Sequence, residues 1–557
     1  MTQDETFLSK LSKARRRAWQ VLLDEGPSQI QFWFLALFVG IFAGLAAVIF
    51  RAAIGALQGF VYFGSDVRNV HSVAAGLPWY WLLIVPILGG FIVGLILNRY
   101  TEDARVRSVA DVIEGAALHN GRVETKAGIA SAFASLITLS TGGSSGREGP
   151  VVHLAGLIST LFAKRINASG ITGRELLGCA VAAAVSASFN APIAGALFAL
   201  EVILRHYAVH AFAPIAIASI AGTVVSRLTF GNDTQFEILG EGVLSFYQEL
   251  PAFLMLGLLS GVVAVVLMQT IFWMDDTATK VQRRIALPRY LRPTIAGALL
   301  GVTAIWFPHI IGVGYETTIA ALEAKLTYSA AIIFVVVKII AVGFTLGGRM
   351  GGGIFSPALM IGALTGLAFG LIATSAAPNL SSDPSLYALA GMGAVAAAVL
   401  GAPISTTLIV FELTGDWQTG LAVMAAVSLS TALASRWVDK SYFLTQLEKR
   451  DIHLAAGPQA YLLALFGVAN IMRPTGAEDG ASDETCWELI GNGIYVDASA
   501  TLEQCMPLFE AHNVSFVPVV TIAGENASPT LEGALFHVDA LKTFNRALVD
   551  TAKEEHD

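Results

Sequence analysis

Long apolar stretches recur along this chain, and they restrict its fold more than any other feature. The five clearest are Phe32–Phe50, Trp81–Leu97, Phe253–Ile271, Ala330–Leu346 and Leu421–Leu433. Several are about as long as one bilayer crossing, whereas other apolar segments are shorter and interrupted by Gly and Pro. Only 14% of the 557 residues are charged, which is too few to cover a soluble protein of this length. The sequence therefore predicts an all-α, multi-pass protein of the lipid bilayer.

Basic residues flank the apolar region at both ends. They precede the first stretch at Lys10, Lys13, Arg15, Arg16 and Arg17, and they follow the last at Arg436, Lys440, Lys449 and Arg450. Because the cytoplasmic flanks of membrane spans are enriched in Lys and Arg, we expect both termini in the cytoplasm and the protein in an inner or plasma membrane. Residues 1–30 are predicted to form a basic amphipathic helix, followed by a transmembrane domain over residues 31–450.

Residues that commonly hold metals or form disulfides are scattered. Cys179, Cys486 and Cys505 lie far apart in the sequence, and the ten histidines show no ligand spacing. We therefore expect no metal site, no cofactor, no catalytic centre and no nucleic-acid partner.

Two distant segments of the apolar region resemble each other. Residues 191–201, with the sequence APIAGALFALE, align with residues 402–412, APISTTLIVFE, at an offset of 211. Pro150 and Pro357, which close two glycine-rich segments, follow a similar offset of 207. Two matching pairs in the same order indicate an internal duplication, with halves at about 31–240 and 245–450. Duplicated membrane halves with interrupted helices are typical of transporters whose site lies where the broken helices meet.

A charged pair lies inside the first glycine-rich segment, Ser140–Pro150, between two apolar runs. Arg147 and Glu148 are costly in lipid unless they face protein or a water-filled cavity. The glycines around them free the backbone from helical geometry, and Pro150 suits the first turn of a new helix. A second segment, Gly347–Pro357, repeats this arrangement. Two helix amino termini that converge inside the membrane predict a binding site for a small anion.

Glu148 has a particular role in such a site. Its carboxylate is itself an anion that can occupy the same cradle of N–H groups, and its protonation frees the cradle for a transported ion. We therefore predict that Glu148 is the gate and that Arg147 supports the local fold or field. The alternative is a structural turn with an ion pair of no function, but the second glycine-rich break and the repeat favour a functional site.

Four segments resemble the CLC family of chloride channels and proton-coupled chloride transporters, some of them voltage-gated. They are Gly146–Pro150, Gly351–Pro357, Phe189–Glu201 and Gly401–Asp416, and the similarity extends from about Phe32 to Arg450. The resemblance implies chloride transport by a homodimer with one ion pathway per subunit, built from two inverted halves of tilted helices. With Glu148 as the gate, the anion-binding residues in these two glycine-rich segments are Gly146, Arg147, Gly149, Gly353, Ile354 and Phe355.

Three positions depart from the usual pattern of the family. Arg107–Asp111 stands where the family usually has Gly-Ser-Gly-Ile-Pro, so Ser108 keeps a hydroxyl for the anion but loses its flanking glycines. The central tyrosine of the family corresponds to Phe443, or to Tyr442 if the alignment shifts by one residue. Val202 occupies the place of a proton-relay glutamate in exchangers, and an apolar side chain carries no proton. The sequence therefore favours channel-like or weakly proton-coupled conduction, with a chloride–proton antiporter as the alternative.

After Arg450 the composition becomes that of a small α/β domain in water, over residues 457–557. Residues 493–520 predict a strand, a helix capped by Ser499 or Thr501, and a second strand, and residues 531–548 add a strand and a helix. Pro507 lies inside the first of these helices. Its predicted apolar face comprises Leu502, Cys505, Met506 and Phe509.

This C-terminal region resembles a single cytoplasmic CBS module. The segments that carry the resemblance are Val468–Pro474, Ser515–Val520 and Gly533–Asp539. Modules of this type usually act in pairs, so the resemblance implies pairing across a dimer axis. It implies either an adenine nucleotide bound through Asp539 or a purely structural clamp of the dimer.

Two functions outside transport remain as alternatives. Residues 143–146, GSSG, contain a G-x-S-G string, so Ser145 with His153 or His206 as base would make an intramembrane serine protease. Such a mechanism requires the nucleophile and base within hydrogen-bond reach, which the sequence spacing does not demand. The other alternative is a sensor that transports nothing and reads nucleotides through the C-terminal region.

Overall fold

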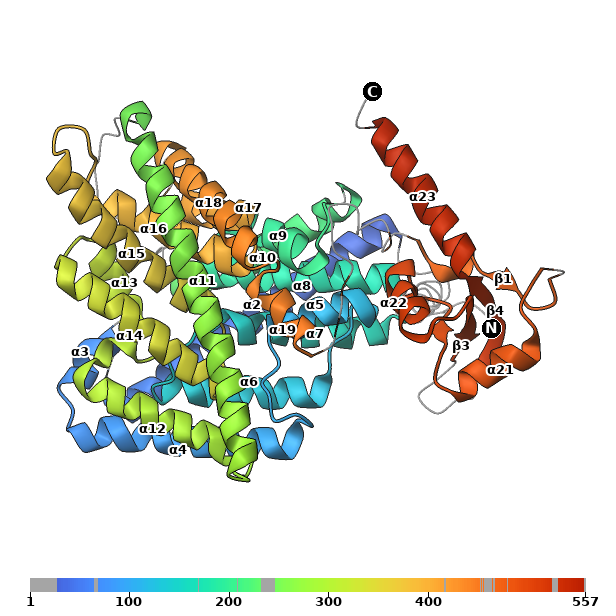
Figure 1. Cartoon of the computed structure of the whole chain (residues 1–557), viewed down its shortest axis with the longest axis horizontal. Helices are drawn as coiled ribbons and strands as arrows, with labels where there is room; N and C mark the ends of the chain where they lie inside the picture. Colours follow the sequence, from blue (N-terminus) through green and yellow to red (C-terminus); the bar gives the residue numbers. More distant parts are fainter. Residues whose placement is uncertain are drawn as a thin grey trace, which may run out of the picture.

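The computed structural model describes residues 28–64, 69–168, 170–207, 209–231, 246–414, 417–450, 452, 454, 463, 466–477, 479–522 and 529–554. Figure 1 shows a helical body and, at one end of it, the C-terminal region in red. The predicted basic helix over residues 1–30 lies outside the described residues except for residues 28–30.

Seven of the described helices are long and apolar enough to cross a bilayer. They are α2 (Gln29–Tyr62), α4 (Trp79–Tyr100), α10 (Val209–Phe230), α11 (Phe246–Arg284), α14 (Tyr328–Gly347), α15 (Phe355–Ala376) and α18 (Trp417–Trp437). Each of the five predicted apolar stretches lies inside one of these helices, which confirms the multi-pass membrane class. Large apolar side chains such as Phe34, Trp273 and Ile333 are exposed on them, as a surface in contact with lipid requires.

The other described helices of this region are shorter or less apolar. They are α3 (Val70–Ala75), α5 (Val109–Leu118), α6 (Thr125–Ser140), α7 (Glu148–Arg165), α8 (Gly170–Phe189), α9 (Pro192–Phe198), α12 (Leu291–Trp306), α13 (Tyr315–Leu322), α16 (Pro384–Leu400), α17 (Pro403–Thr414) and α19 (Tyr442–Glu448), with a π-helix η2 (Ala199–Leu204) and a 3-10 turn η3 (Pro308–Ile310). Small residues let the central helices pack closely. A Cβ on Gly362 of α15 would lie 2.4 Å from the carbonyl oxygen of Gly391 in α16.

The two halves of the membrane region exchange equivalent contacts. Glu201 accepts hydrogen bonds from the backbone N–H groups of Ile404 and Ser405, at 3.0 and 2.8 Å, at the start of α17. Glu412 accepts the equivalent pair from the start of α9, also at 3.0 and 2.8 Å. Each of these backbone donors and carboxylate acceptors corresponds to its counterpart at the offset of 211 residues, whereas the additional bond from the hydroxyl of Ser405 to Glu201 has no counterpart at Ala194. This reciprocity supports the predicted duplication, because a two-fold relation between equivalent surfaces produces paired contacts of this kind.

The C-terminal region forms a small mixed sheet with helices packed on it. Its strands are β1 (Arg473–Pro474), β2 (Val496–Asp497), β3 (Phe516–Thr521) and β4 (Thr530–Phe536), in the order β1-β4-β3-β2, with only β2 and β3 parallel. Its helices are α21 (Asp483–Gly491), α22 (Leu502–His512) and α23 (His537–Glu554), preceded by a 3-10 turn η4 (Val468–Asn470). The strands and helices predicted for residues 493–520 and 531–548 are present as β2, α22, β3, β4 and α23. The sequence pattern did not predict α21.

Helix α22 has the cap and the buried face that the sequence predicted. Thr501, rather than Ser499, is its N-cap, and the helix continues through Pro507. Cys505 lies in the core beneath the sheet, and burial raises the pKa of its thiol to about 12. Because the thiol therefore stays protonated at neutral pH, Cys505 serves packing rather than redox chemistry.

Helix α22 also attaches the C-terminal region to the membrane region. Arg174 of α8 and Glu503 of α22 form a buried ion pair at 3.1 Å, each side chain being 7% exposed. Asn120, just beyond the end of α5, donates to the hydroxyl of Ser499 at 3.2 Å and accepts from Gln504 at 2.9 Å. The C-terminal region is therefore in specific contact with the end of α5.

Candidate functional site

The two glycine-rich breaks meet at the centre of the membrane region. The N–H of Gly146 donates to the carbonyl of Gly353, and the N–H of Gly353 donates to that of Gly146, both at 2.7 Å. A Cβ on Gly353 would lie 2.8 Å from the nitrogen of Gly149, so there is no room for a side chain between the two segments at this position. Helices α7 and α15 begin directly after these breaks, at Glu148 and Phe355. The predicted convergence of two helix amino termini is therefore confirmed.

Glu148 lies between the two helix starts. It is the first residue of α7, is 3% exposed, and accepts a hydrogen bond at 2.6 Å from the hydroxyl of Ser356, the second residue of α15. Its other carboxylate oxygen, Oε2, has no hydrogen-bond partner among the described residues. A Cβ on Gly146 would lie 2.5 Å from this oxygen. The carboxylate is thus held against the start of the opposite helix.

Arg147 lines a different cavity from the other predicted site residues. Its Nε lies 3.9 Å from Oε1 of Glu148, and its Nη2 donates to the carbonyl of Ser188 at 3.4 Å. Its guanidinium carbon lies 5.3 Å from the centre of the Tyr315 ring. With Tyr315 and His309 it lines a cavity of about 570 Å³, the outer cavity. The positive charge of Arg147 therefore supports Glu148 from the side facing this outer cavity.

A second, smaller cavity brings together most of the predicted anion-binding residues. Its volume is about 80 Å³, and a site of about 10–15 Å³ already holds one water. We call it the inner cavity. The predicted residues that line it are Ser108, Glu148, Gly149, Gly353, Ile354, Phe355, Tyr442 and Phe443. Gly146 lies beside it through its pairing with Gly353. The start of α15 thus opens directly onto a space that admits a small ion.

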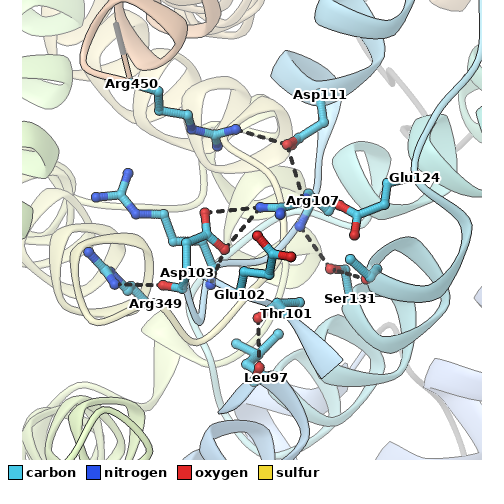
Figure 2. Close-up of polar contacts among 12 residues, drawn as sticks. Leu97, Thr101, Glu102, Asp103, Arg107, Asp111, Glu124, Ser131, Arg349 and Arg450 are labelled. Carbon is cyan, nitrogen blue, oxygen red and sulfur yellow. Dashed lines mark hydrogen bonds and ion pairs between the residues drawn. The ribbon is translucent and has the colours of Figure 1, made fainter. Parts of the chain in front are cut away.

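The loop before α5, which departs from the family pattern, is held by ion pairs (Figure 2). Arg107 contacts Asp103 at 3.0 Å, Asp111 at 3.7 Å and Glu124 at 3.2 Å, and its backbone N–H donates to the hydroxyl of Ser131 at 2.8 Å. These contacts fix the backbone that the missing glycines and proline would otherwise shape. They leave Ser108, the residue next to Arg107, at the wall of the inner cavity.

Two further contacts tie this loop to distant parts of the chain. Arg450 donates to Asp111 at 2.8 Å, and Arg349 donates to the carbonyl of Asp103 at 3.1 Å (Figure 2). Burial alone would raise the pKa of Asp103, but attraction and hydrogen bonding by Arg107 outweigh it and hold that pKa below its usual value. The ion pair therefore stabilises the loop at neutral pH and is lost in acid, as the pH falls through that lowered pKa.

The aromatic position and the relay position have different surroundings. Tyr442 and Phe443 are both buried and both line the inner cavity, so the structure does not choose between the two alignments. The ring of Tyr442 stacks on Phe272 with centres 5.2 Å apart. Val202 lies in the π-helix η2, is 5% exposed, and is not part of the inner cavity wall.

Ser145, the nucleophile of the alternative protease mechanism, has no base within hydrogen-bond reach among the described residues. The hydroxyl of Ser145 and both ring nitrogens of His153 are buried and have no hydrogen-bond partner among the described residues. His206 places its Nδ1 3.0 Å from the carbonyl of Leu204. These contacts give no nucleophile–base pair of the kind that serine hydrolysis needs.

The sequence analysis did not identify Ser356 as a partner of Glu148. Its hydroxyl holds Glu148, although the two residues are 208 positions apart. A signal for it was present, because Ser356 lies two residues into the helix that follows the second glycine-rich break. Short polar side chains at that position commonly serve the start of a helix, and here the side chain serves the opposite one.

Two helix starts that face a small buried cavity, with one carboxylate between them, define a membrane protein with a pathway for small anions. The chain belongs to the family of voltage-gated chloride channels, the CLC family, whose model matches residues 89–435. It is 29% identical over 396 residues to the ClcB-like chloride channel protein of Ralstonia nicotianae, covering 70% of this chain and 91% of that one.

Other relatives include exchangers and a solved structure. The chain is 27% identical over 461 residues to the H(+)/Cl(-) exchange transporter ClcA of Vibrio cholerae, covering 81% of this chain and 96% of that protein. It shares its fold with a eukaryotic CLC transporter of known crystal structure, with a TM-score of 0.65, 17% identity, and coverage of 91% of this chain and 97% of the other. Members of this family are transporters and channels, not enzymes, which removes the protease alternative.

Proposed function

We propose that this protein conducts chloride through the inner cavity, that Glu148 gates the pathway, and that conduction is channel-like or only weakly coupled to protons. The observation that carries the gating proposal is the position of Glu148. Its buried carboxylate occupies the space between the starts of α7 and α15, next to the inner cavity. Positive partial charges at both helix starts stabilise either this carboxylate or a chloride ion there, so the two compete.

The gating proposal is tested by removing the charge of Glu148. In proteoliposomes, Glu148→Gln should conduct chloride at alkaline pH, where the wild type is closed, because a neutral amide does not compete with the anion. Glu323→Gln, in the link after α13, is the matched control and should retain the wild-type pH dependence. Retention of that dependence by Glu148→Gln would remove Glu148 as the gate.

Weak proton coupling is supported by the apolar relay position. Val202 is 5% exposed and carries no titratable group, so it cannot accept a proton on its way to Glu148. The measurement is the reversal potential of the purified protein in opposed chloride and proton gradients. A potential that follows the chloride gradient alone supports a channel, whereas a dependence on the proton gradient overturns this part of the proposal.

A chloride–proton antiporter is the second candidate, because the Vibrio cholerae relative is named an exchanger and the similarity covers 81% of this chain. An antiporter would need a proton route that bypasses Val202. In vesicles without other ion pathways, an imposed chloride gradient should then drive measurable proton uptake or release.

We also propose a homodimer with both termini in the cytoplasm. An apolar groove of about 450 Å³ between α17 and α18 is suited to a second copy, and it includes Ile404, Phe411 and Met424 in its wall. The repeat also supports pairing of two copies through this face. Ile193 and Ile404, which are equivalent residues of the two halves, are 53% and 48% exposed. Native mass measurement of the protein in detergent tests the pairing, and introduction of Trp at Ile193 and Ile404 should produce monomers.

For the C-terminal region we propose a CBS-like module. The three segments that carry the resemblance contain β1, β3 and β4, which are adjacent in the sheet. Asp539 accepts a hydrogen bond from Nε of Arg473 at 2.8 Å, which raises the pKa of Arg473 and engages one carboxylate oxygen. This internal partner favours a structural clamp over nucleotide binding. Calorimetric titration with an adenine nucleotide distinguishes the two roles.

A further inference from the structure

A wide basic cavity opens beside the inner cavity, and none of the roles above uses it. Its volume is about 630 Å³, and six cationic side chains line it: Arg105, Arg283, Arg289, Arg349, Lys449 and Arg450. We call it the basic basin. Among the described residues, the only acidic ones in its wall are Glu102 and Asp103. Lys449 and Arg450 directly follow α19, where the chain leaves for the C-terminal region, so the basin lies on the face that we assign to the cytoplasm.

The carboxylates around the basic basin do not neutralise it. Arg105 and Arg349 share one carboxylate, Asp275, at 3.5 and 3.6 Å, and Arg292 contacts that same group at 2.7 Å. Three positive charges therefore meet one negative charge. Asp276, the next residue, pairs with Lys449 at 2.6 Å.

Several N–H donors around the basin remain unused. The Nη1 of Arg450 donates a hydrogen bond to Asp111. Its Nε and Nη2 are buried and have no hydrogen-bond partner among the described residues. The Nε of Arg349 also lacks a hydrogen bond among the described residues and lies 3.6 Å from the shared carboxylate of Asp275. Arg289 donates to the carbonyl of Glu102 at 3.1 Å. Buried donors without partners are rare in native proteins and indicate a missing acceptor.

The missing acceptor has the chemistry of a phosphate. Guanidinium groups present forked donors that match the oxygens of a phosphate, and several together favour an anion with more than one charge. Cavities of about 300–1,000 Å³ are typical for organic ligands, so the basin far exceeds what a chloride ion needs. We propose that the basic basin binds a small multivalent anion that carries phosphate groups.

A ligand in the basin would stand in the ion pathway. Four residues, Arg105, Arg349, Lys449 and Arg450, line both the basic basin and the inner cavity. The basin is therefore the space through which an ion passes between the inner cavity and this face. A bound phosphate compound obstructs chloride flux from that side, a consequence that rests on the proposed transport function, whereas binding itself does not.

The phosphate groups have two available sources, a soluble polyphosphate compound or the headgroup of an anionic lipid. A groove of about 270 Å³ along α11 supports a lipid, because its wall includes apolar Trp273, Ile285 and Ile295. Gln282 belongs to the walls of both the groove and the basin, so a headgroup in the basin can leave its acyl chain in the groove. Pyrophosphate and phosphatidic acid are the probes for the two sources.

The binding test compares two double variants with the same change in charge. Arg283→Gln/Arg289→Gln removes two basin residues that do not line the inner cavity. Lys280→Gln/Arg284→Gln removes two exposed charges from the same end of α11 that line neither cavity. Calorimetric titration of the purified full-length protein with pyrophosphate should show binding to the wild type and to the second variant. Binding to the first should weaken about tenfold or more, since two guanidinium–phosphate contacts are lost.

The flux test uses proteoliposomes of phosphatidylcholine with pyrophosphate on both sides. Each protein is compared with its own flux without pyrophosphate, because Arg283 and Arg289 line the proposed ion path and their loss can change the basal flux. Pyrophosphate should reduce this flux in the wild type and in Lys280→Gln/Arg284→Gln, but not in Arg283→Gln/Arg289→Gln. If phosphatidic acid in the vesicles reduces flux without pyrophosphate, the source is a lipid. If only pyrophosphate acts, the source is soluble.

Three results would overturn parts of this proposal separately. The phosphate site is removed if neither probe binds. It is also removed if binding weakens equally in both double variants, because an equal loss reports only surface charge. Binding without any change in flux removes the obstruction. Binding by a protein that conducts no chloride removes the proposed transport function and leaves the binding site intact.

Discussion

Replacement of Ser356 by Ala should loosen the gate without touching the wall of the inner cavity. The hydroxyl of Ser356 donates to the carboxylate of Glu148 at 2.6 Å and does not line that cavity. A hydrogen bond to a charged group contributes about 1.5–3 kcal/mol. Its loss should therefore lower the ratio of closed to open gate by roughly 10- to 100-fold, since about 1.4 kcal/mol corresponds to a factor of ten.

The sign of the effect on pH dependence follows from the same bond. The hydroxyl stabilises the charged carboxylate in the closed site, so its removal makes protonation and opening easier. The midpoint of chloride flux against pH should move to higher pH by about one to two pH units. The assay is chloride efflux from proteoliposomes at a series of pH values, with the amount of monodisperse protein matched between variants.

Ser159→Ala is the control for this experiment. Ser159 lies on α7, is fully buried, and its hydroxyl has no hydrogen-bond partner among the described residues. Its removal deletes the same hydroxyl from the helix that carries Glu148 and should leave the midpoint unchanged. The reasoning fails if Ser356→Ala is folded and keeps the wild-type midpoint, or if Ser159→Ala shifts it equally.

Three further predictions concern the framework around the site. Gly353→Ala should destabilise the protein by about 1–3 kcal/mol in thermal unfolding, because the added Cβ would lie 2.8 Å from the nitrogen of Gly149. Gly491→Ala is the control and should change the stability little, because the space around Gly491 is open. Arg174→Ala should weaken docking by about 1.5–3 kcal/mol, because Glu503 loses its charged hydrogen-bond partner at 3.1 Å while Arg205 still attracts that carboxylate. Limited proteolysis should then release the C-terminal region faster; an unchanged rate would contradict the role of this pair. Glu201→Gln and Glu412→Gln should each lower the unfolding temperature by weakening a helix start by about 0.5–2 kcal/mol, with the larger effect at Glu201, which also accepts from the hydroxyl of Ser405. An effect at only one of the two positions would argue against equivalent halves.

The centre of the site follows from local sequence patterns. Glycine clusters that end in Pro150 and Pro357 mark the starts of α7 and α15 because each residue acts on its own backbone. The repeat predicted that the two glycine-rich breaks converge, and the structure adds that Gly146 pairs with Gly353 there. These predictions needed no knowledge of distant contacts, so the sequence was sufficient.

The edges of the site depend on contacts between distant residues and were not predictable in this way. The loop that holds Ser108 is fixed by Arg107 and by a bond from Arg450 to Asp111, 339 positions away. Arg147 was grouped with the anion-binding residues because it adjoins Glu148, but successive residues at a helix start point in different directions, and Arg147 lines the outer cavity. The basic basin was missed because its six charges come from four separate segments of the chain.

The paired bonds between Gly146 and Gly353 have a consequence for how the two halves depend on each other. Each glycine satisfies the other, so half of the protein on its own would expose an unmatched strand fragment at the depth where no water replaces the lost partner. A single half would therefore need a second copy of itself to satisfy these groups, and one chain now supplies both partners within each subunit.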